Sequence, residues 1–180
     1  MAIAAWGTTG SYYHDLTLTG HVGWACWSDC FLSRVERILA TGSATGNARF
    51  GILHNKAGGI TSYRDMQVQG FDYGIVLIDG SGQIDEVYLS SSRNVGILIG
   101  GTESEYTLRG IRNTTEGVTD PRYEMAMLLK GKSVHLRDST IEGAPFAVAP
   151  IWVDGTTSVQ PSSISVTDCS ALARTFGRAT

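Results

Sequence analysis

Residues 63–78 read YRDMQVQGFDYGIVLI and contain two strand patterns in succession. The first begins with an acid and then alternates apolar and polar residues up to Gly70. Strict alternation over four or five positions is the two-residue period of a strand with one buried face. The second begins Tyr73-Gly74-Ile75 and continues with apolar residues. The stretch therefore predicts two consecutive strands of different character, joined by a turn.

The first pattern recurs along the chain. The copy YHDLTLTG at residues 13–20 nearly superposes on YRDMQVQG at residues 63–70. Looser copies are RVERILATG (34–42), QIDEVYLSS (83–91), TLRGIRNTT (107–115), HLRDSTIEG (135–143) and SVTDCSALA (165–173). The position of the acid is taken by Asp15, Arg37, Asp65, Glu86, Gly110, Asp138 and Asp168, about 25 residues apart on average. A unit repeated at such a period is typical of solenoid proteins.

The second pattern follows most copies of the first. It consists of an apolar residue, Gly or Ala, and another apolar residue, and its copies begin at Val22, Phe50, Tyr73, Val95, Met125 and Phe146. Two strands per repeat form a coil when each turn lies parallel on the turn before, about 4.8 Å away. We therefore predict an all-β fold, a right-handed single-stranded parallel β-helix of about seven turns, as a single domain over residues 1–180. The repeats begin and end without a capping element, so we also expect either a segment of a longer fibre or spike, or a chain whose ends are covered by partners.

One stretch is compatible with a helix instead of a strand. Between residues 29 and 41, Leu32, Val35 and Ile38 recur at helical spacing, with an acid in front and a glycine behind. The strand copy RVERILATG overlaps the same residues. The sequence leaves strand and helix open for residues 29–41.

Charge and composition argue against several classes of partner. The 180-residue chain has a net charge of −3 and no Lys/Arg cluster, so we expect no binding to nucleic acid or to an anionic membrane. No apolar run reaches the roughly 18 residues of a membrane span, and the N-terminus lacks the pattern of a signal peptide. We expect no cofactor and no metal, because His21, Cys26 and Cys30 match no paired-cysteine zinc motif. The three cysteines, with Cys169 as the third, are expected to be reduced.

The second strand type has an additional apolar residue. It lies at a position where a strand with one buried face would have a polar residue. The residue after each triplet is Ala25, Leu53, Val76, Leu98, Leu128 or Ala149. Near-continuous apolar runs are typical of strands that are buried on both faces. We therefore predict that another copy of the chain covers this sheet in a homo-oligomer, with the column of Gly and Ala residues as a flat strip for close approach. The alternatives are a wide internal cavity, or glycines that serve only local turns.

These Asp-apolar-polar-apolar and aromatic-Gly-Ile-apolar strands resemble the pectate-lyase-like β-helix superfamily, and within it most closely phage tailspike and tail-appendage proteins. The resemblance extends over essentially the whole chain, at the level of architecture. It implies a trimer that binds bacterial surface polysaccharide, and in many members cleaves it by hydrolysis or elimination between carboxylates. It also implies a location in the virion tail or outside the cell, which needs no signal peptide because virion proteins are made in the host cytoplasm.

Acidic residues are the candidates for catalysis. Glycosidic cleavage requires two carboxylates, and stacked turns supply such pairs as Asp65 over Glu86, or Asp138 over Asp168. Acids at strand entry more often bind backbone N–H groups of turns, and Arg37 would make the column a charge ladder. Acids in loops are better placed, since functional groups sit on loops over a rigid scaffold. The catalytic candidates are Asp79, Glu103, Glu105, Glu116 and Asp120, with Asp85 and Glu124 in the same region.

Aromatic and basic side chains are the candidates for binding a sugar. Trp27 and Trp152 fall outside the apolar column that Trp24 shares, so we expect Trp24 in the core and the other two at a ligand. Arg122 and Tyr123 lie in the longest loop, beside its acids. Core packing or solvated loops are the simpler interpretation of each.

The sequence therefore predicts a tailspike-like β-helix that assembles as a trimer and binds, or also depolymerises, bacterial surface polysaccharide. The first alternative is a purely structural shaft or adhesin segment. The second is a polysaccharide lyase or epimerase, for which Arg109, Arg112 or Arg122 would supply the basic group.

Overall fold

Twelve strands make up the part of the chain that the computed structural model describes, which is residues 3–27, 32–42, 48–114, 125–142, 149–153 and 158–167. No helix occurs within these ranges. The strands are β1 (Ile3–Trp6), β2 (Tyr12–Gly20), β3 (Val22–Trp27), β4 (Arg34–Gly42), β5 (Phe50–Gln69), β6 (Tyr73–Ser90), β7 (Val95–Gly100), β8 (Glu105–Thr114), β9 (Met125–Leu129), β10 (Ser133–Glu142), β11 (Ala149–Val153) and β12 (Ser158–Thr167).

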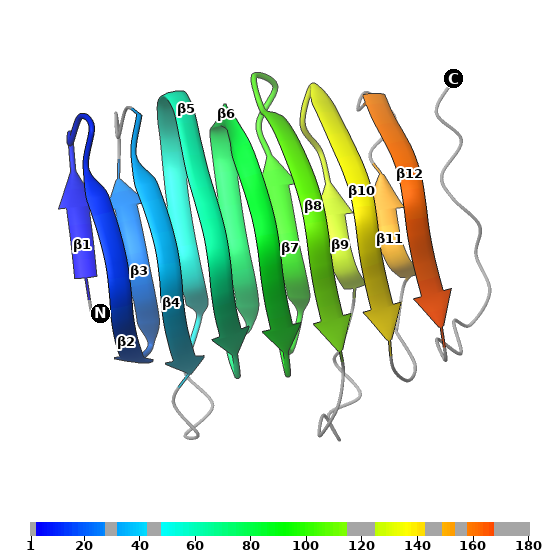
Figure 1. Ribbon diagram of the computed structural model, residues 1–180, viewed down its shortest axis with the longest axis horizontal. Helices are drawn as coiled ribbons and strands as arrows, with labels where there is room; N and C mark the ends of the chain where they lie inside the picture. Colours follow the sequence, from blue (N-terminus) through cyan, green and yellow to red (C-terminus); the bar gives the residue numbers. More distant parts are fainter. Residues whose placement is uncertain are drawn as a thin grey trace.

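The strands stack in two rows, and every pairing between neighbours is parallel (Figure 1). One row has the order β1-β3-β5-β6-β7-β9-β11, and β2, β4, β8, β10 and β12 pair along the other row. The long strands β5 and β6 bend and take part in both rows. The chain is therefore a β-solenoid of stacked parallel strands, as predicted.

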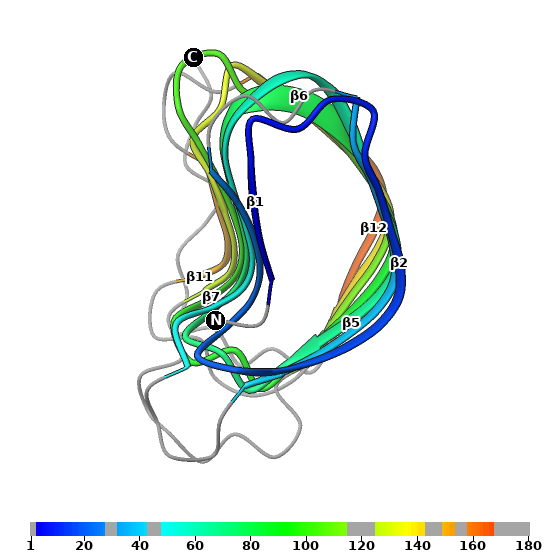
Figure 2. The same cartoon turned by 90° about the vertical axis from the view of Figure 1, so that its left-hand side faces the viewer.

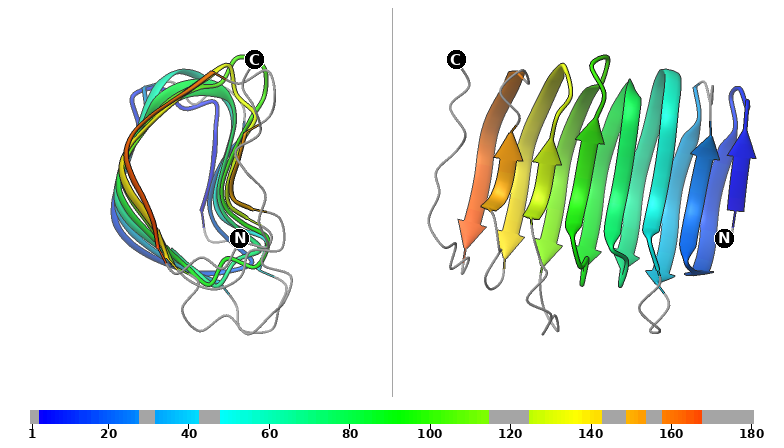
Figure 3. Two further views of the ribbon diagram at one scale, coloured as in Figure 1. Left: turned by 90° about the vertical axis from the view of Figure 1, so that its right-hand side faces the viewer. Right: turned by 180° about the vertical axis from the view of Figure 1, so that it is seen from behind.

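Seen along the stack, the two rows enclose a common interior (Figure 2). The row with β7 and β11 curves toward that interior, whereas the row with β2, β5 and β12 bows outward. The opposite views in Figure 3 show the same outline and the shorter strands of the inward-curving row. The strand β4 replaces the helical alternative for residues 29–41, which is wrong over the described part of that stretch.

The column of acids marks a sharp bend in the outward-bowing row. Its backbone φ angles are 54° at Asp15, 51° at Arg37, 52° at Asp65, 52° at Glu86, 64° at Gly110 and 47° at Asp138. The pairing of β2 with β4 runs to His14↔Glu36 and resumes at Leu16↔Ile38, so the bend residues leave the ladder. Left-handed φ angles favour Gly and, among other residues, Asp and Asn. The recurrent acid thus positions a corner of the coil.

Apolar side chains from both rows fill the interior. Trp24 is fully buried, as predicted, and its position in the stacked strands is taken by Ile52, Ile75, Ile97, Met127 and Ile151. The other row contributes fully buried or nearly buried residues such as Ile38, Met66, Val87 and Ile111. One continuous core therefore joins the stacked turns.

The glycine column also faces the interior, so the predicted flat strip for another chain is wrong. A Cβ atom on Gly23 would lie 2.6 Å from the carbonyl oxygen of Gly51 and 3.2 Å from Cβ of Ala40. On Gly74 it would lie 2.7 Å from Cδ2 of Leu89. Glycine is required here because the carbonyl group of the next strand in the same row and a side chain of the opposite row, Ala40 or Leu89, leave no room for a Cβ atom.

The residues after the glycine triplets form a second apolar column on the outer face of the inward-curving row. Strand register places Ala25, Leu53, Val76, Leu98, Leu128 and Trp152 in it. The assignment of Ala149 was wrong by three residues, because Ala149 pairs with Met125 and Trp152 pairs with Leu128. Ala25, Leu53 and Val76 are buried within the single chain, Leu98 and Leu128 are half-buried, and Trp152 is 43% exposed. The exposed part of this column is its C-terminal end.

Cys26 is in a disulfide bond. The expectation of a reduced thiol is therefore wrong for Cys26, while Cys30 and Cys169 lie outside the described residues. Cys26 points into the core and is fully buried. Within the described ranges, no helix is long and apolar enough to cross a membrane.

Candidate functional site

Several of the predicted site residues cannot be placed in a site. Glu116, Asp120, Arg122 and Tyr123 lie outside the described residues, and so does the side chain of Trp27, although its backbone ends β3. The remaining candidates are Asp79, Glu103, Glu105 and Trp152.

A polar groove crosses β6, β8 and β10 on the outward-bowing row. Parallel register places Gln83, Thr107 and His135 side by side, and Ser81, Glu105 and Ser133 form the next line. The outward side chains are polar because the inward neighbours Ile84, Leu108 and Leu136 occupy the core. The groove has a volume of about 350 Å³ and is lined by Ser81, Gly82, Gln83, Glu105, Tyr106, Thr107, Ser133 and His135. Hydroxyl, amide, imidazole and carboxylate groups therefore meet on one surface.

Glu105 closes one end of this groove in an ion pair. Its Oε1 lies 2.7 Å from Nζ of Lys132, and both side chains are at least half exposed. The hydrogen bond to Glu105 raises the pKa of Lys132, and the negative charges of Glu105 and Glu103 add to this effect. One predicted catalytic acid, Glu105, is thus paired with a lysine, and the charge of a second, Glu103, also acts on that lysine. The sequence did not indicate Lys132, because only the strand register brings it next to an acid 27 residues earlier.

Asp79 lies at a bend and does not line this groove. Its φ angle is 48°, and its carboxylate lies against the backbone of Gly101, where a Cβ atom would be 2.6 Å from Cγ of Asp79. Burial raises the pKa of the Tyr106 hydroxyl, and the negative charge of Asp79 raises it further. Asp79 therefore lies at a bend of β6 beside Gly101 and away from the groove lining.

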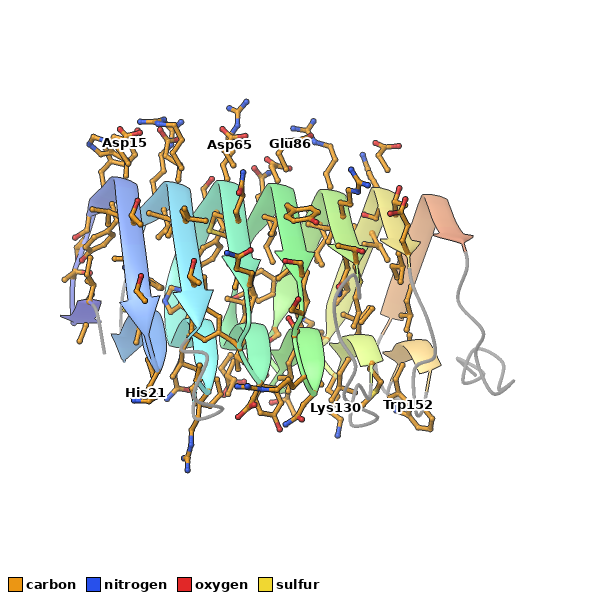
Figure 4. All side chains as sticks on the ribbon, turned by 90° about the horizontal axis from the view of Figure 1, so that it is seen from below. Asp15, His21, Asp65, Glu86, Lys130 and Trp152 are labelled. Atoms are coloured by element: carbon orange, nitrogen blue, oxygen red, sulfur yellow. The ribbon has the colours of Figure 1, made fainter. Side chains whose placement is uncertain are left out.

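A second groove runs along the bend column. It has a volume of about 340 Å³ and is lined by Asp65, Met66, Gln67, Glu86, Val87, Tyr88, Gly110 and Arg112. The acids Asp65 and Glu86 project from the same edge of the molecule, on the edge that also carries Asp15 (Figure 4). A Cβ atom on Gly110 would lie 2.6 Å from Oε1 of Glu86, so the glycine makes room for this carboxylate. The stacking of Asp65 and Glu86 on neighbouring turns is as predicted.

Arg112 supplies the positive charge of the second groove. Its guanidinium carbon lies 5.8 Å from the centre of the Tyr88 ring, a cation–π distance. Its Nη2 atom lies 3.3 Å from Oε2 of Glu142. The aromatic ring, the cation and the two acids on the bend form a polar surface, but Arg112 is already engaged by a third carboxylate.

The N-terminal end of the bend column is an ion-pair network. Nε of Arg37 lies 2.6 Å from Oδ1 of Asp15, and this hydrogen bond lowers the pKa of Asp15. The nearly buried Glu36 contacts Arg34, at 2.6 Å, and also Arg37 and the hydroxyl of Tyr12. The hydrogen bond from Tyr12 lowers the pKa of Glu36. The charge ladder predicted at Arg37 is present toward Asp15, and its groups are occupied by one another.

Trp152 lies far from both acids of the second groove. Figure 4 shows it with His21 and Lys130 on the side of the molecule opposite Asp15, Asp65 and Glu86. It ends the outer apolar column described above. Trp152 is therefore exposed, but it lies in an apolar surface and not beside the acids.

Among the described residues, no group of three or more His, Cys, Asp or Glu side chains gathers in a way that could hold a metal ion. The groove residues that sequence reasoning missed are Gln83, Thr107 and His135. They occupy equivalent outward positions in three copies of the repeat. An alignment of these copies could therefore have predicted that the three side chains lie next to one another.

Comparisons of the chain with protein families, with curated proteins and with solved structures give no match. The likeness to pectate-lyase-like and tailspike proteins therefore stays a prediction.

Proposed function

We propose that the chain is a tailspike-like β-solenoid domain that binds bacterial surface polysaccharide through the groove across β6, β8 and β10. The single observation that carries this proposal is the line of Gln83, Thr107 and His135, three polar side chains on neighbouring strands. Strands in a sheet are about 4.8 Å apart, so the line repeats at a spacing comparable to the length of a sugar ring. Amide, hydroxyl and imidazole groups donate and accept hydrogen bonds as sugar hydroxyls do.

The assembly that accompanies this function is a homotrimer whose chains meet at the outer apolar column. Support comes from Leu98, Leu128 and Trp152, which form a run of exposed or half-buried apolar residues on neighbouring strands. Exposed contiguous apolar patches commonly mark interaction surfaces. In this proposal the coil is right-handed and makes about seven turns, the arrangement expected from the recurrence of both strand patterns.

Location in a virion tail or outside the cell completes the proposal. The disulfide bond of Cys26 favours it, because disulfides persist in oxidising surroundings and are rare in the cytosol.

Retention of the protein on immobilised polysaccharide is the direct test. The protein is passed over immobilised capsular and outer-membrane polysaccharides, together with a Thr107→Tyr variant in which a bulky ring fills the groove. The matched control is Thr17→Tyr, which places the same ring at an exposed position on β2. We expect wild type and control to be retained on at least one polysaccharide and Thr107→Tyr to be lost. Equal retention of the two variants would exclude this groove.

Cleavage of the bound polymer is a separate property, and Asp65 with Glu86 is the pair of carboxylates that the described geometry offers for it. Release of reducing ends by wild type, and its loss in Glu86→Gln with retention unchanged, would establish hydrolysis. Unsaturated products would instead establish a lyase, for which Lys132 or Arg112 supplies the basic group. Retention without any product would restrict the function to binding.

A structural shaft is the second candidate. It is favoured by the extent of charge pairing on the surface, where Asp15, Asp72, Asp85, Glu105 and Glu142 each contact a basic side chain. A shaft requires no free polar groove, so the absence of retention on every polysaccharide in the test above would favour it.

A further inference from the structure

A ladder of charged side chains runs beside the polar groove, one step further along the same strands. Register pairs Arg64 with Asp85, Asp85 with Arg109, and Arg109 with Arg137, on β5, β6, β8 and β10. The charges along the ladder are therefore positive, negative, positive and positive.

The last member of this ladder is not compensated. Nε of Arg109 lies 3.3 Å from Oδ1 of Asp85, and Nε of Arg64 lies 3.4 Å from Oδ2 of Asp65. Arg137 is exposed, and no carboxylate within the described ranges lies within ion-pair distance of it. Like charges directly opposite each other on paired strands are destabilising, so an anion at this point would be favourable.

The two arginines adjoin the groove on the same face of the sheet. Arg137 is two residues after His135 and Arg109 is two residues after Thr107, and residues two apart in a strand share a face. The distance between such positions is about 7 Å, which is within the span of one sugar ring with its substituent. The ladder and the groove thus form one continuous surface.

Within the ladder, the two neighbouring arginines Arg109 and Arg137 are matched by the single carboxylate of Asp85, since Arg64 pairs with Asp65. A guanidinium group presents a planar fork of N–H donors that binds oxyanions through two parallel hydrogen bonds.

We propose that the groove takes an acidic saccharide, in which a singly charged oxyanion on the sugar binds Arg137 beside Arg109 and the ring lies over Thr107 and His135. This inference rests on the proposed polysaccharide function and deepens it by naming the class of substrate. The oxyanion is a uronic acid carboxylate or a phosphodiester, which present the same charge to the guanidinium group.

Affinity electrophoresis through gels that contain hyaluronate, carboxyl-reduced hyaluronate, poly(glycerol phosphate) or dextran tests the proposal. Wild type is expected to be retarded by at least one of the two anionic polymers and to run freely in dextran. Retardation by hyaluronate but not by its reduced form identifies the carboxylate, and retardation by poly(glycerol phosphate) alone identifies the phosphodiester.

Substitution of Arg137 by Gln is expected to weaken retardation about tenfold or more, as is usual for the loss of a hydrogen bond to a charged group. Arg137→Lys should restore part of it, since the charge is kept and the planar fork is lost. The control is Arg49→Gln, which removes the same charge at an exposed position before β5.

Three results would overturn the proposal. They are equal retardation of wild type and Arg137→Gln, equal retardation of Arg49→Gln and Arg137→Gln, and free migration of wild type in both anionic gels. Binding to a neutral polysaccharide that Thr107→Tyr abolishes would leave the proposed function in place and remove only the acidic class. Free migration together with no retention on any polysaccharide would remove both.

Discussion

At the scale of single residues, the backbone bend explains why the chain repeats an acid. The φ angles near +50° at Asp15, Asp65, Glu86 and Asp138 are reached by few residue types without strain. The repeated acid is visible in the sequence. Its position at a corner of the coil agrees with the interpretation that these acids serve turns. Arg37 was also placed at this position from the sequence, and its ion pair with Asp15 on the neighbouring strand is the charge ladder expected there.

Replacement of a bend acid tests this account. Asp138 has a φ angle of 47° and is exposed. Asp138→Val should lower the free energy of unfolding by about 1–2 kcal/mol, the cost of placing a β-branched residue in the left-handed region. Asp138→Asn should change it by less than half of that, because Asn tolerates this conformation. Urea unfolding followed by circular dichroism measures both, and equal losses in the two variants would contradict the account.

A buried histidine predicts a pH dependence of stability. His54 is fully buried, contacts the hydroxyl of Tyr63, and has its ring 5.7 Å from that of Trp24. Burial lowers its pKa from 6.5 to about 4, so the folded protein binds fewer protons than the unfolded chain between these two values. Stability is therefore greatest above pH 6.5 and falls by about 3 kcal/mol as the pH is lowered toward 4.

Urea unfolding at several values between pH 7 and pH 4 measures this loss, with His54→Gln as the comparison. The variant should lose much less stability over the same range. Asp15 and Glu36 have lowered pKa values in the folded protein. They therefore stabilise it at pH values above the ordinary pKa of a carboxyl group, and this stabilisation is lost only at lower pH. A wild-type curve that is flat down to pH 4 would refute the role of His54.

At the scale of strands, the two sequence patterns predicted well which residues form strands. They predicted less well which face the glycines lie on and how β11 is aligned with its neighbouring strand. The alternation in the second halves of β5 and β6 indicated which residues face the core, because a two-residue period leaves no choice of face. The orientation of the glycine column was missed, since glycine has no side chain whose polarity could indicate a face. The register of β11 was missed by three residues, because Phe146-Ala147-Val148 fits the triplet pattern, whereas the strand itself begins at Ala149 and has Pro150 where the pattern requires Gly or Ala.

The close packing of the two rows at the glycine column predicts a steric effect. A Cβ atom on Gly74 would lie 2.6 Å from the carbonyl oxygen of Gly96 and 2.7 Å from Cδ2 of Leu89. Gly74→Ala should therefore lower the free energy of unfolding by about 1–3 kcal/mol, as overpacking usually does. Gly100→Ala is the matched control, because its Cβ atom would meet only Cδ2 of Leu98, at 3.3 Å. Thermal unfolding of the two variants measures the difference, and a Gly74→Ala variant as stable as the control would contradict the packing described.

At the scale of the whole molecule, the sequence predicted a solenoid but not its functional surfaces. Repetition along the chain is enough to indicate stacked turns, whereas a groove arises from side chains on three turns that are 24 to 28 residues apart, as with Gln83, Thr107 and His135. The catalytic candidates were acids chosen because the sequence places them in loops between the predicted strands. Among those that are described, Asp79 lies at a bend and Glu105 pairs with Lys132.

The outer apolar column makes a prediction about assembly. Multi-angle light scattering should give a mass close to three times the 19.3 kDa of the single chain. Leu128→Asp, which places a charge in the half-buried middle of the exposed run, should reduce the mass to that of one chain while the far-ultraviolet circular dichroism stays unchanged. A wild-type mass of a single chain would contradict the proposed trimer.

The most direct test of the central claim, that the groove across β6, β8 and β10 binds a saccharide, is hydroxyl-radical footprinting with and without the retained polysaccharide. The account predicts that oxidation of His135, which lines the groove, is reduced several-fold by the ligand, whereas oxidation of Tyr12, which is 48% exposed on β2, is unchanged. Protection confined to Tyr88 would place the ligand in the second groove, and protection confined to Trp152 would place it on the apolar column. Either of these results, with His135 unprotected, would contradict the account.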